Sequence, residues 1–291
     1  MKIAIIGAAY TGLEAARYLK SKGHTITVTT TKEARVAELE PVSDRVIVMV
    51  GEDREKMREV IAGQNAVLMT VAGGMVERDG KYVMDPDLYR STYCGTAESL
   101  VDSLDAAPDL KQIIFTGSWS VYGNAGGADH VDENTPVTPV GPFQQVYQEA
   151  ENTLLAAETD QLKVAIYRTG TIYGPAAGYM PRELKSSALP MAGQSIPFDG
   201  ESPATIIHRD DVVKALEFAC ENHLSGIFNL VNDISTSKAE FFGNIVAEAG
   251  LEPMNWLGNG TGPKNLSNQK IKDAGYAFLD PLAAGDGQAL L

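Results

Sequence analysis

The sequence predicts an α/β fold in which helices cover both faces of a doubly wound parallel sheet. Two observations lead to this prediction. Short apolar runs, such as residues 3–6, have the composition of strands that are buried on both faces. These runs alternate with helical patterns as far as residue 173, as they do in sheets built from β-α-β units.

The elements follow one another in a regular order. Residues 3–31 are predicted to form a strand, a turn of small residues, a helix that stops at Gly23, and a second strand. Further strands are predicted at 45–50, 66–72, 112–116, 164–168 and 228–231, and helices at 53–62, 88–104, 143–158, 206–221 and 237–249. Residues 75–87 are expected to be a polar loop, and the residues after 249 a loose tail. Right-handed crossovers would bring the carboxyl ends of the strands to one edge.

The turn after the first strand has the spacing of a pyrophosphate-binding loop. Its residues, Gly7-Ala8-Ala9-Tyr10-Thr11-Gly12, match G-x-G-x-x-G with alanine at the second glycine. The first glycine permits a tight turn, the second position lets the backbone approach a pyrophosphate, and the third lets helix pack on strand. The N–H groups of the helix then face the phosphates. The loop predicts a Rossmann-type dinucleotide site, with a plain tight turn as the alternative, and its expected cofactor-binding residues are Gly7, Ala9, Tyr10, Thr11 and Gly12.

The end of the second strand favours NADP over NAD. Folds that bind NAD carry Asp or Glu about 20 residues after the glycine loop, to hold a ribose hydroxyl. Thr30, Lys32 and Arg35 stand here instead, and hydroxyls with two cations suit a 2′-phosphate. The alternative is that Lys32 and Arg35 are ordinary solvated charges. At the same edge of the sheet, Val71 and Ala72 are expected to line the cofactor.

Composition excludes several classes of protein. The formal net charge of −14 argues against nucleic acid or an anionic membrane as a partner, because both require a basic face. Cys94 and Cys220 are far apart and form no C-x-x-C, so neither a disulfide scaffold nor a zinc site is expected. With no leader pattern and no apolar run near the length of a membrane span, a cytoplasmic location is expected.

Five motifs follow one another along the chain: the glycine loop, Y-C-G-T at 93–96, S-x-x-V-Y-G at 118–123, R-x-x-x-I-Y-G-P at 168–175 and I-H-x-D-D at 207–211. In this order they resemble the NAD-dependent epimerase/dehydratase group of the extended and atypical short-chain dehydrogenase/reductases. The resemblance implies a Rossmann domain at 1–173, completed by 204–233, and a substrate-covering region at 174–203 and 234–291. It also implies a small-molecule substrate and a homodimer built from helices 88–104 and 143–158.

The resemblance implies a Ser, Tyr and Lys chemistry that this chain carries only in part. Ser118 matches the serine that bonds the substrate oxygen. Glu151 matches the glutamate four residues after the lysine, so Tyr147 stands at the lysine position and Phe143 at the tyrosine position. Phe143 has no ionisable proton. Tyr147 could reach the nicotinamide ribose or a substrate oxygen, and the alternative is a structural tyrosine with a satisfied hydroxyl.

Four further residues are candidates for the site. Three of them have two possible roles, and the role of the fourth is implied by the resemblance alone. Tyr122 is a candidate catalytic residue that could instead pack and shape the pocket. Tyr173 is implied as a wall beside the nicotinamide. His208 could act as an acid or base, or join segments structurally. Arg168 could bind a substrate anion or pair with a carboxylate.

The leading hypothesis is an NADP-preferring oxidoreductase or epimerase-like enzyme with a non-standard active site. Its substrate would be a small polar carbonyl or carbinol, or a nucleotide sugar. The alternative, suggested by Phe143, is a non-catalytic NADP-binding sensor or scaffold. A third hypothesis is a pocket that holds another adenosine compound.

Overall fold

The computed structural model describes residues 1–78, 81–123, 125, 128–139, 141–176, 183–197, 199–233, 236–258 and 265–279. The chain divides into two compact units, and each is described by itself. The first contains Met1–Val121, Gly141–Tyr167 and Val213–Ile227, and the second contains Tyr122–Val140, Arg168–Val212 and Phe228–Leu291. The domain boundaries expected from the sequence, at 173, 203 and 233, stay a prediction.

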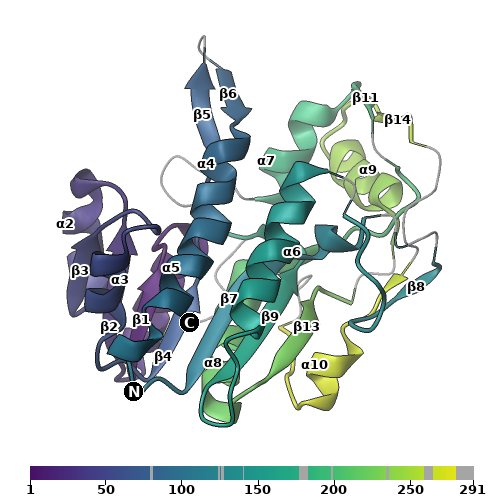
Figure 1. Cartoon of the computed structure of the whole chain (residues 1–291). Coiled ribbons are helices and arrows are strands. Elements are labelled where there is room, and N and C mark those ends of the chain that lie inside the picture. The colour runs from purple at the N-terminus through teal and green to yellow at the C-terminus, as the bar shows by residue number, and fades with distance from the viewer. Residues whose placement is uncertain are drawn as a thin grey trace. The chain divides into compact units, whose positions relative to one another are not determined.

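Seven strands form the central sheet in the order β13-β9-β7-β4-β1-β2-β3 (Figure 1). Their bounds are β1 Lys2–Ile6, β2 Thr25–Thr30, β3 Arg45–Val48, β4 Ala66–Met69, β7 Gln112–Ser118, β9 Lys163–Thr169 and β13 Gly226–Leu230. Strand β1 pairs in parallel with β2 on one side and with β4 on the other. The strand order therefore reverses between β1 and β4, and open α/β sheets bind their ligands at the carboxyl ends of such a pair. The predicted doubly wound α/β fold is confirmed.

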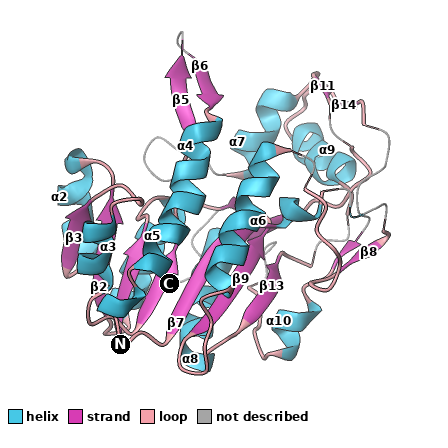
Figure 2. Ribbon diagram, viewed as in Figure 1, coloured by secondary structure: helices cyan, strands magenta, loops and turns pink. Residues whose placement is uncertain are grey.

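Helices flank this sheet, as Figure 2 shows. Their bounds in the first part of the chain are α1 Tyr10–Ser21, α2 Val36–Leu39, α3 Arg54–Ile61, α4 Pro86–Arg90, α5 Thr96–Asp102 and α6 Pro142–Leu155, and α8 is Arg209–Asn222. Short 3-10 turns lie at Glu33–Arg35, Glu40–Val42, Leu104–Ala106, Trp119–Tyr122 and Leu189–Met191.

The core of the first unit explains why the strands are apolar without interruption. Ala4 and Ile6 of β1 pack in one cluster with Met57 of α3 and with residues of α5 and α6. Ile3 and Ile5 are also fully buried, and strand alternation turns them to the opposite face. On the helices, the Tyr18 hydroxyl of α1 donates to Glu217 of α8 at 2.8 Å, so these two helices are neighbours. Burial of both sheet faces is the condition for an all-parallel sheet.

The predicted helix at 88–104 is three helical pieces in one run. It starts at α4, where the Asp85 carboxylate caps the N–H groups of Asp87 and Leu88. A π turn, Ser91–Gly95, joins α4 to α5. One additional residue in the turn rotates the side chains that follow it, and such turns occur frequently at functional sites.

Residues 75–87 were expected to be a loop, and this expectation was wrong. Strands β5 Met75–Arg78 and β6 Lys81–Met84 form an antiparallel pair next to α4 (Figure 1). Val76 and Val83 are directly opposite each other. Two short alternating runs separated by Asp-Gly are a hairpin signal in the sequence, and the polar composition of the segment obscured it.

The second unit contains short pairs of parallel strands. Strand β10 Thr171–Tyr173 pairs with β12 Ile206–His208, β11 Ser195–Ile196 with β14 Asn255–Trp256, and β8 His130–Val131 with β15 Asn265–Leu266. Its other helices are α7 Leu184–Ala188, α9 Lys238–Glu248 and α10 Gln269–Asp273.

The residues after 249 are not the loose tail that was expected. Besides β14, β15 and α10, a segment beyond α10 is fixed to the I-H-x-D-D motif. The Tyr276 hydroxyl donates to the Asp211 carbonyl at 2.7 Å, and the Leu279 N–H donates to the Asp211 carboxylate at 2.7 Å. The sequence hid this because the anchors are isolated residues rather than a periodic pattern.

Candidate functional site

The glycine loop has the close approaches for which glycine is required. Gly7 has φ of +94°, and a Cβ there would lie 2.8 Å from the Cα of Val71. A Cβ on Gly12 would lie 2.6 Å from Oγ1 of Thr70. The Gly7 N–H donates to Oγ1 of Thr29 at 3.0 Å, which fixes the start of the loop on β2. The loop therefore lies tightly between the ends of β2 and β4.

The first turn of α1 presents backbone rather than side chains to a ligand. Ala9 is the N-cap residue, it makes no side-chain capping bond, and the first turn contains no acidic residue. Tyr10 and Thr11 are buried within this turn. A helix end of this kind binds phosphate through its N–H groups and its dipole. The chain thus fits the pyrophosphate of a dinucleotide at this position.

Arg35 and Lys32, the two cations expected to recognise a 2′-phosphate, have different surroundings. Nη1 of Arg35 donates to the Ala8 carbonyl at 2.6 Å, and its Nε donates to Glu38 at 2.8 Å. The guanidinium is therefore held on the glycine loop. Lys32 is exposed, and its N–H donates to Oγ1 of the buried Thr30 at 3.3 Å.

The segment after β4 lies against the same loop. Oγ1 of Thr70 donates to the Gly7 carbonyl at 3.0 Å. Val71 is half-buried and Ala72 is exposed. This placement agrees with a crevice that opens at the carboxyl ends of β1 and β4.

A cluster of aromatic side chains surrounds Tyr147 of α6. We call Tyr89, Tyr93 and Tyr147 the phenol cluster. The Tyr147 hydroxyl donates to the Tyr93 hydroxyl at 3.2 Å, and their ring centroids are 4.7 Å apart. Tyr89 packs at 4.7 Å from Tyr93 and at 5.7 Å from Tyr147. Phe143, at the position where the family has tyrosine, packs edge-on against Tyr89 at 5.0 Å.

The phenol cluster is connected to the segment after β4. The backbone N–H of Gly73 acts on the Tyr93 hydroxyl and opposes the rise in the pKa of Tyr93. Burial is the largest cause that raises the pKa of all three phenols, well above the ordinary value of 10. At neutral pH the three hydroxyls are therefore protonated, and each can donate a hydrogen bond.

Ser118 ends β7 and is half-buried. Its hydroxyl donates to the Ser120 hydroxyl at 2.9 Å and accepts the Ser120 N–H at 3.2 Å. On the same strand, the ring of Phe115 lies 6.5 Å from the ring of Tyr147. The structure therefore places Ser118 three residues beyond a contact of Tyr147, without a direct bond between the two hydroxyls.

Two other candidates, Tyr122 and Arg168, lie in the second unit and contact each other. Tyr122 is fully buried, and its hydroxyl donates to Oδ1 of Asn229 at 2.8 Å. The guanidinium carbon of Arg168 lies 4.7 Å from the centre of the Tyr122 ring. Burial raises the pKa of Tyr122. Tyr122 is therefore packed against Arg168 and hydrogen-bonded to Asn229.

Tyr173 and His208 are also neighbours within the second unit. Their ring centroids are 5.2 Å apart in an edge-on arrangement, and His208 has no exposed surface. Nδ1 of His208 accepts the Asp210 N–H at 3.2 Å.

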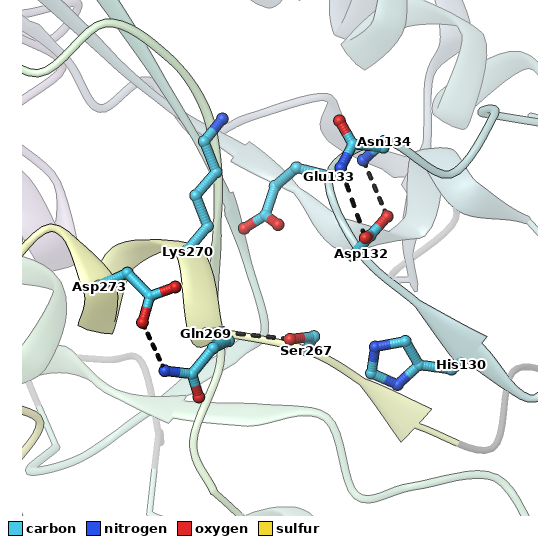
Figure 3. Close-up of a pocket in the computed structure, with 8 residues that line it drawn as sticks. All are labelled: His130, Asp132, Glu133, Asn134, Ser267, Gln269, Lys270 and Asp273. Carbon is cyan, nitrogen blue, oxygen red and sulfur yellow. Dashed lines mark hydrogen bonds between the residues drawn. The ribbon is translucent and has the colours of Figure 1, made fainter.

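The second unit has a hollow of about 350 Å³, drawn in Figure 3. Its side chains are polar and belong to the β8 and α10 segments: His130, Asp132, Glu133, Asn134, Ser267, Gln269, Lys270 and Asp273. The Glu133 carboxylate accepts the Asn229 N–H at 2.7 Å, and burial raises its pKa. Within the described ranges, no three His, Cys, Asp or Glu side chains are grouped to hold a metal ion.

The reversed strand order, the glycine loop and the uncapped start of α1 define a dinucleotide-binding protein of the Rossmann type. The model of the NAD dependent epimerase/dehydratase family matches residues 3–230. The chain therefore belongs to this family of NAD-dependent oxidoreductases and epimerases, as the motifs predicted.

Known relatives resemble the chain along most of its length. Protein YeeZ of Escherichia coli K12 is 27% identical over 292 residues, covering 97% of both chains. The 3-diazoavenalumate denitrifying reductase of a Streptomyces species is 26% identical over 255 residues, covering 85% of this chain and 81% of the reductase. WbmH of Bordetella bronchiseptica, solved with NAD+, has a TM-score of 0.76 at 15% identity and covers 99% and 96% of the two chains. The last likeness is one of fold.

Sequence reasoning missed two residues that the structure puts beside Tyr147. Tyr93 had been noted only as part of the Y-C-G-T motif, and Tyr89 had not been noted. The available signal was the spacing of four residues between them, which places both on one helix face.

No described helix is both apolar enough and long enough to cross a bilayer.

Proposed function

We propose that this protein is an NADP-preferring reductase that acts on a small polar carbonyl compound. The single observation behind this proposal is the neutral phenol of Tyr147, which stands at the family's lysine position and beside other phenols. Bound NADPH would supply the hydride. Side chains of the protein would orient the substrate and supply the proton.

The protonation state of Tyr147 favours reduction over oxidation. Reduction of a carbonyl needs an acid that gives a proton to the oxygen as negative charge develops there. Oxidation or epimerisation begins with loss of a proton from an alcohol and needs a base. Because burial raises the pKa of Tyr147, its resting form is the acid. In this proposal Ser118 orients the carbonyl oxygen and Tyr147 holds the proton.

The preference for NADP rests on Arg35. A guanidinium held on the glycine loop can form a fork of hydrogen bonds with a 2′-phosphate. Similarity supports the broader part of the proposal, since one relative carries the name of a reductase and WbmH was solved with NAD+. MoeE5, 20% identical with a TM-score of 0.74, was solved with UDP-glucose and NAD, so nucleotide sugars belong in the substrate panel.

Oxidation of NADPH, followed by absorbance against a panel of aldehydes, ketones, quinones and nucleotide sugars, tests this function. We expect Tyr147→Phe to lower kcat by about 100-fold or more, and Ser118→Ala by about 10- to 100-fold. Tyr167→Phe is the matched control: it also removes a buried hydroxyl, one that donates to the Ala215 carbonyl at 2.6 Å. Rates that stay unchanged in both site variants would remove these assignments.

The second candidate is a non-catalytic NADP-binding sensor. The observation in its favour is that Phe143, at the family's tyrosine position, packs against Tyr89 and has no ionisable proton. This candidate predicts tight NADPH binding, no NADPH oxidation with any panel member, and a partner whose affinity changes when NADPH is bound.

A further inference from the structure

The phenol cluster has a second hydroxyl in contact with the proposed acid. Tyr93 is 4% exposed, and its oxygen lies 3.2 Å from that of Tyr147. Within the first unit, this is a hydroxyl-to-hydroxyl contact between residues 54 positions apart, from the π turn and from α6. Both rings also pack against Tyr89, the ring of Tyr93 at a tilt and the ring of Tyr147 edge-on, so the two residues belong to one packed cluster.

The backbone sets the direction and the surroundings of the Tyr93 side chain. The π turn Ser91–Gly95 sets its direction, because it interrupts the regular helical rotation between α4 and α5. The Gly73 N–H acts on the Tyr93 hydroxyl and opposes the rise in the pKa of Tyr93. In the structure the Tyr147 hydroxyl donates to Tyr93. When Tyr147 donates to a substrate instead, the hydrogen of the Tyr93 hydroxyl can rotate toward the Tyr147 oxygen.

We propose that Tyr93 is a positioning residue that stabilises Tyr147 as it gives up its proton. This inference rests on the proposed function. The hydrogen bonds would run from the Tyr93 O–H to the Tyr147 oxygen, and from the Tyr147 O–H to the substrate oxygen. In the transfer, the O–H bond of Tyr147 breaks and an O–H bond forms on the reduced substrate. Tyr93 keeps its proton, and Tyr147 regains one from water.

In this arrangement Tyr93 does part of what the family's lysine does. The lysine stabilises a phenolate by charge, whereas a phenol can stabilise it only by donating a hydrogen bond. Hydrogen bonds in a chain polarise one another, so a bond from Tyr93 to the Tyr147 oxygen strengthens the bond from Tyr147 to the substrate. A hydrogen bond to an oxygen that is becoming negatively charged is stronger than a hydrogen bond to a neutral oxygen.

The test uses a reporter that needs neither cofactor nor substrate. Tyr147→3,5-difluorotyrosine places a more acidic phenol at position 147, and its ionisation is followed by absorbance in the folded full chain. We expect Tyr93→Phe to raise the pKa of this reporter by about one to two pH units, because a bond to the phenolate is lost. Tyr167→Phe should leave it unchanged. Tyr93→His keeps a ring donor and should restore most of the lower pKa, which also covers the case in which Tyr93→Phe does not fold.

A reporter pKa that is the same with and without the Tyr93 hydroxyl overturns the inference, whatever the activity. In turnover, Tyr93→Phe should lower kcat about 10- to 100-fold with little change in KM or in the Kd for NADPH. A purely structural role would instead lower the melting temperature and weaken NADPH binding. A shifted reporter in a protein that reduces no panel member supports the role of Tyr93 and contradicts the reductase.

Discussion

Arg35 is held at the glycine loop by two partners of different kinds. One is the Ala8 carbonyl, which orients the guanidinium without neutralising it. The other is Glu38, a half-exposed carboxylate that would compete with a bound phosphate for the same cation. The proposed preference for NADP would therefore depend on the balance between Glu38 and the 2′-phosphate at one arginine.

This balance can be shifted in both directions. Arg35→Ala should weaken NADPH binding by about 10-fold or more and leave NADH binding nearly unchanged, since a charge-assisted bond to phosphate is lost. Glu38→Gln should strengthen NADPH binding, because it removes the competing carboxylate. Titration of cofactor fluorescence measures both.

Arg54→Ala is a suitable control for the Arg35 variant, since it breaks an ion pair with Asp102 on helices away from the loop. Equal losses of NADPH and NADH affinity in Arg35→Ala would contradict the assignment of Arg35 to the 2′-phosphate.

At the scale of elements, the run from α4 through the π turn to α5 connects the hairpin to the phenol cluster. Its start depends on Asp85, which caps α4 and also pairs with Arg78 of β5 at 2.6 Å. Gly74, just before the hairpin, has φ of +98°, and a Cβ there would meet the ring of Tyr89. Hairpin, helix start and cluster are thus packed into one local structure.

Removal of the cap should weaken this local structure measurably. We expect Asp85→Ala to lower the free energy of unfolding by about 1 kcal/mol, because two N–H groups lose their acceptor. Denaturation by urea measures the change. Glu77→Ala, an exposed acid on β5, is the control and should change stability by less than about 0.5 kcal/mol. Equal effects of the two would show that the cap contributes nothing.

Elements with strong local patterns were predictable from the sequence, and contacts between distant residues were not. The buried strands and the glycine loop were found because apolar runs and glycine spacing express their structure locally. The hairpin was missed because each of its strands is only four residues long and polar residues surround them. The contact of Tyr93 with Tyr147 could not be predicted, because it depends on the π turn and on how α4 and α6 pack. The roles of Ser118 and Tyr147 stay predictions.

At the scale of the whole molecule, the net charge of −14 means that carboxylates dominate the response to pH. Asp44 is one carboxylate with a defined structural role. It accepts the Ile26 N–H at 2.8 Å and pairs with Lys20 at 2.9 Å, and these contacts hold the pKa of Asp44 below its ordinary value.

The sign of the pH dependence follows from this lowered pKa. Asp44 binds a proton more readily in the unfolded chain than in the folded protein, so it contributes stability above its unfolded pKa of about 4. That contribution is lost as the pH falls through the lower, folded value. We expect Asp44→Asn to lower the melting temperature at pH 7, with a difference from the unchanged protein that shrinks toward pH 3. Thermal melts across this range measure it, and a difference that does not vary with pH would contradict the role of the charge.

The homodimer implied by the resemblance also belongs to this scale and stays a prediction. Leu88 of α4 is 41% exposed on one of the two helices expected to build the interface. The mass of the protein in solution, measured by light scattering, decides between one chain and two.

The anchoring of residues 276–279 on Asp211 has a consequence for the order in which the protein is made. Synthesis runs from the amino end, so Asp211 leaves the ribosome 65 residues before the tyrosine hydroxyl that bonds to its carbonyl. During that interval the Tyr276 hydroxyl and the Leu279 N–H, which donate to the Asp211 carboxylate in the folded protein, have not yet been synthesised. The second unit can therefore reach its final packing only late in translation, whereas β1, α1 and β2 can assemble as soon as they emerge.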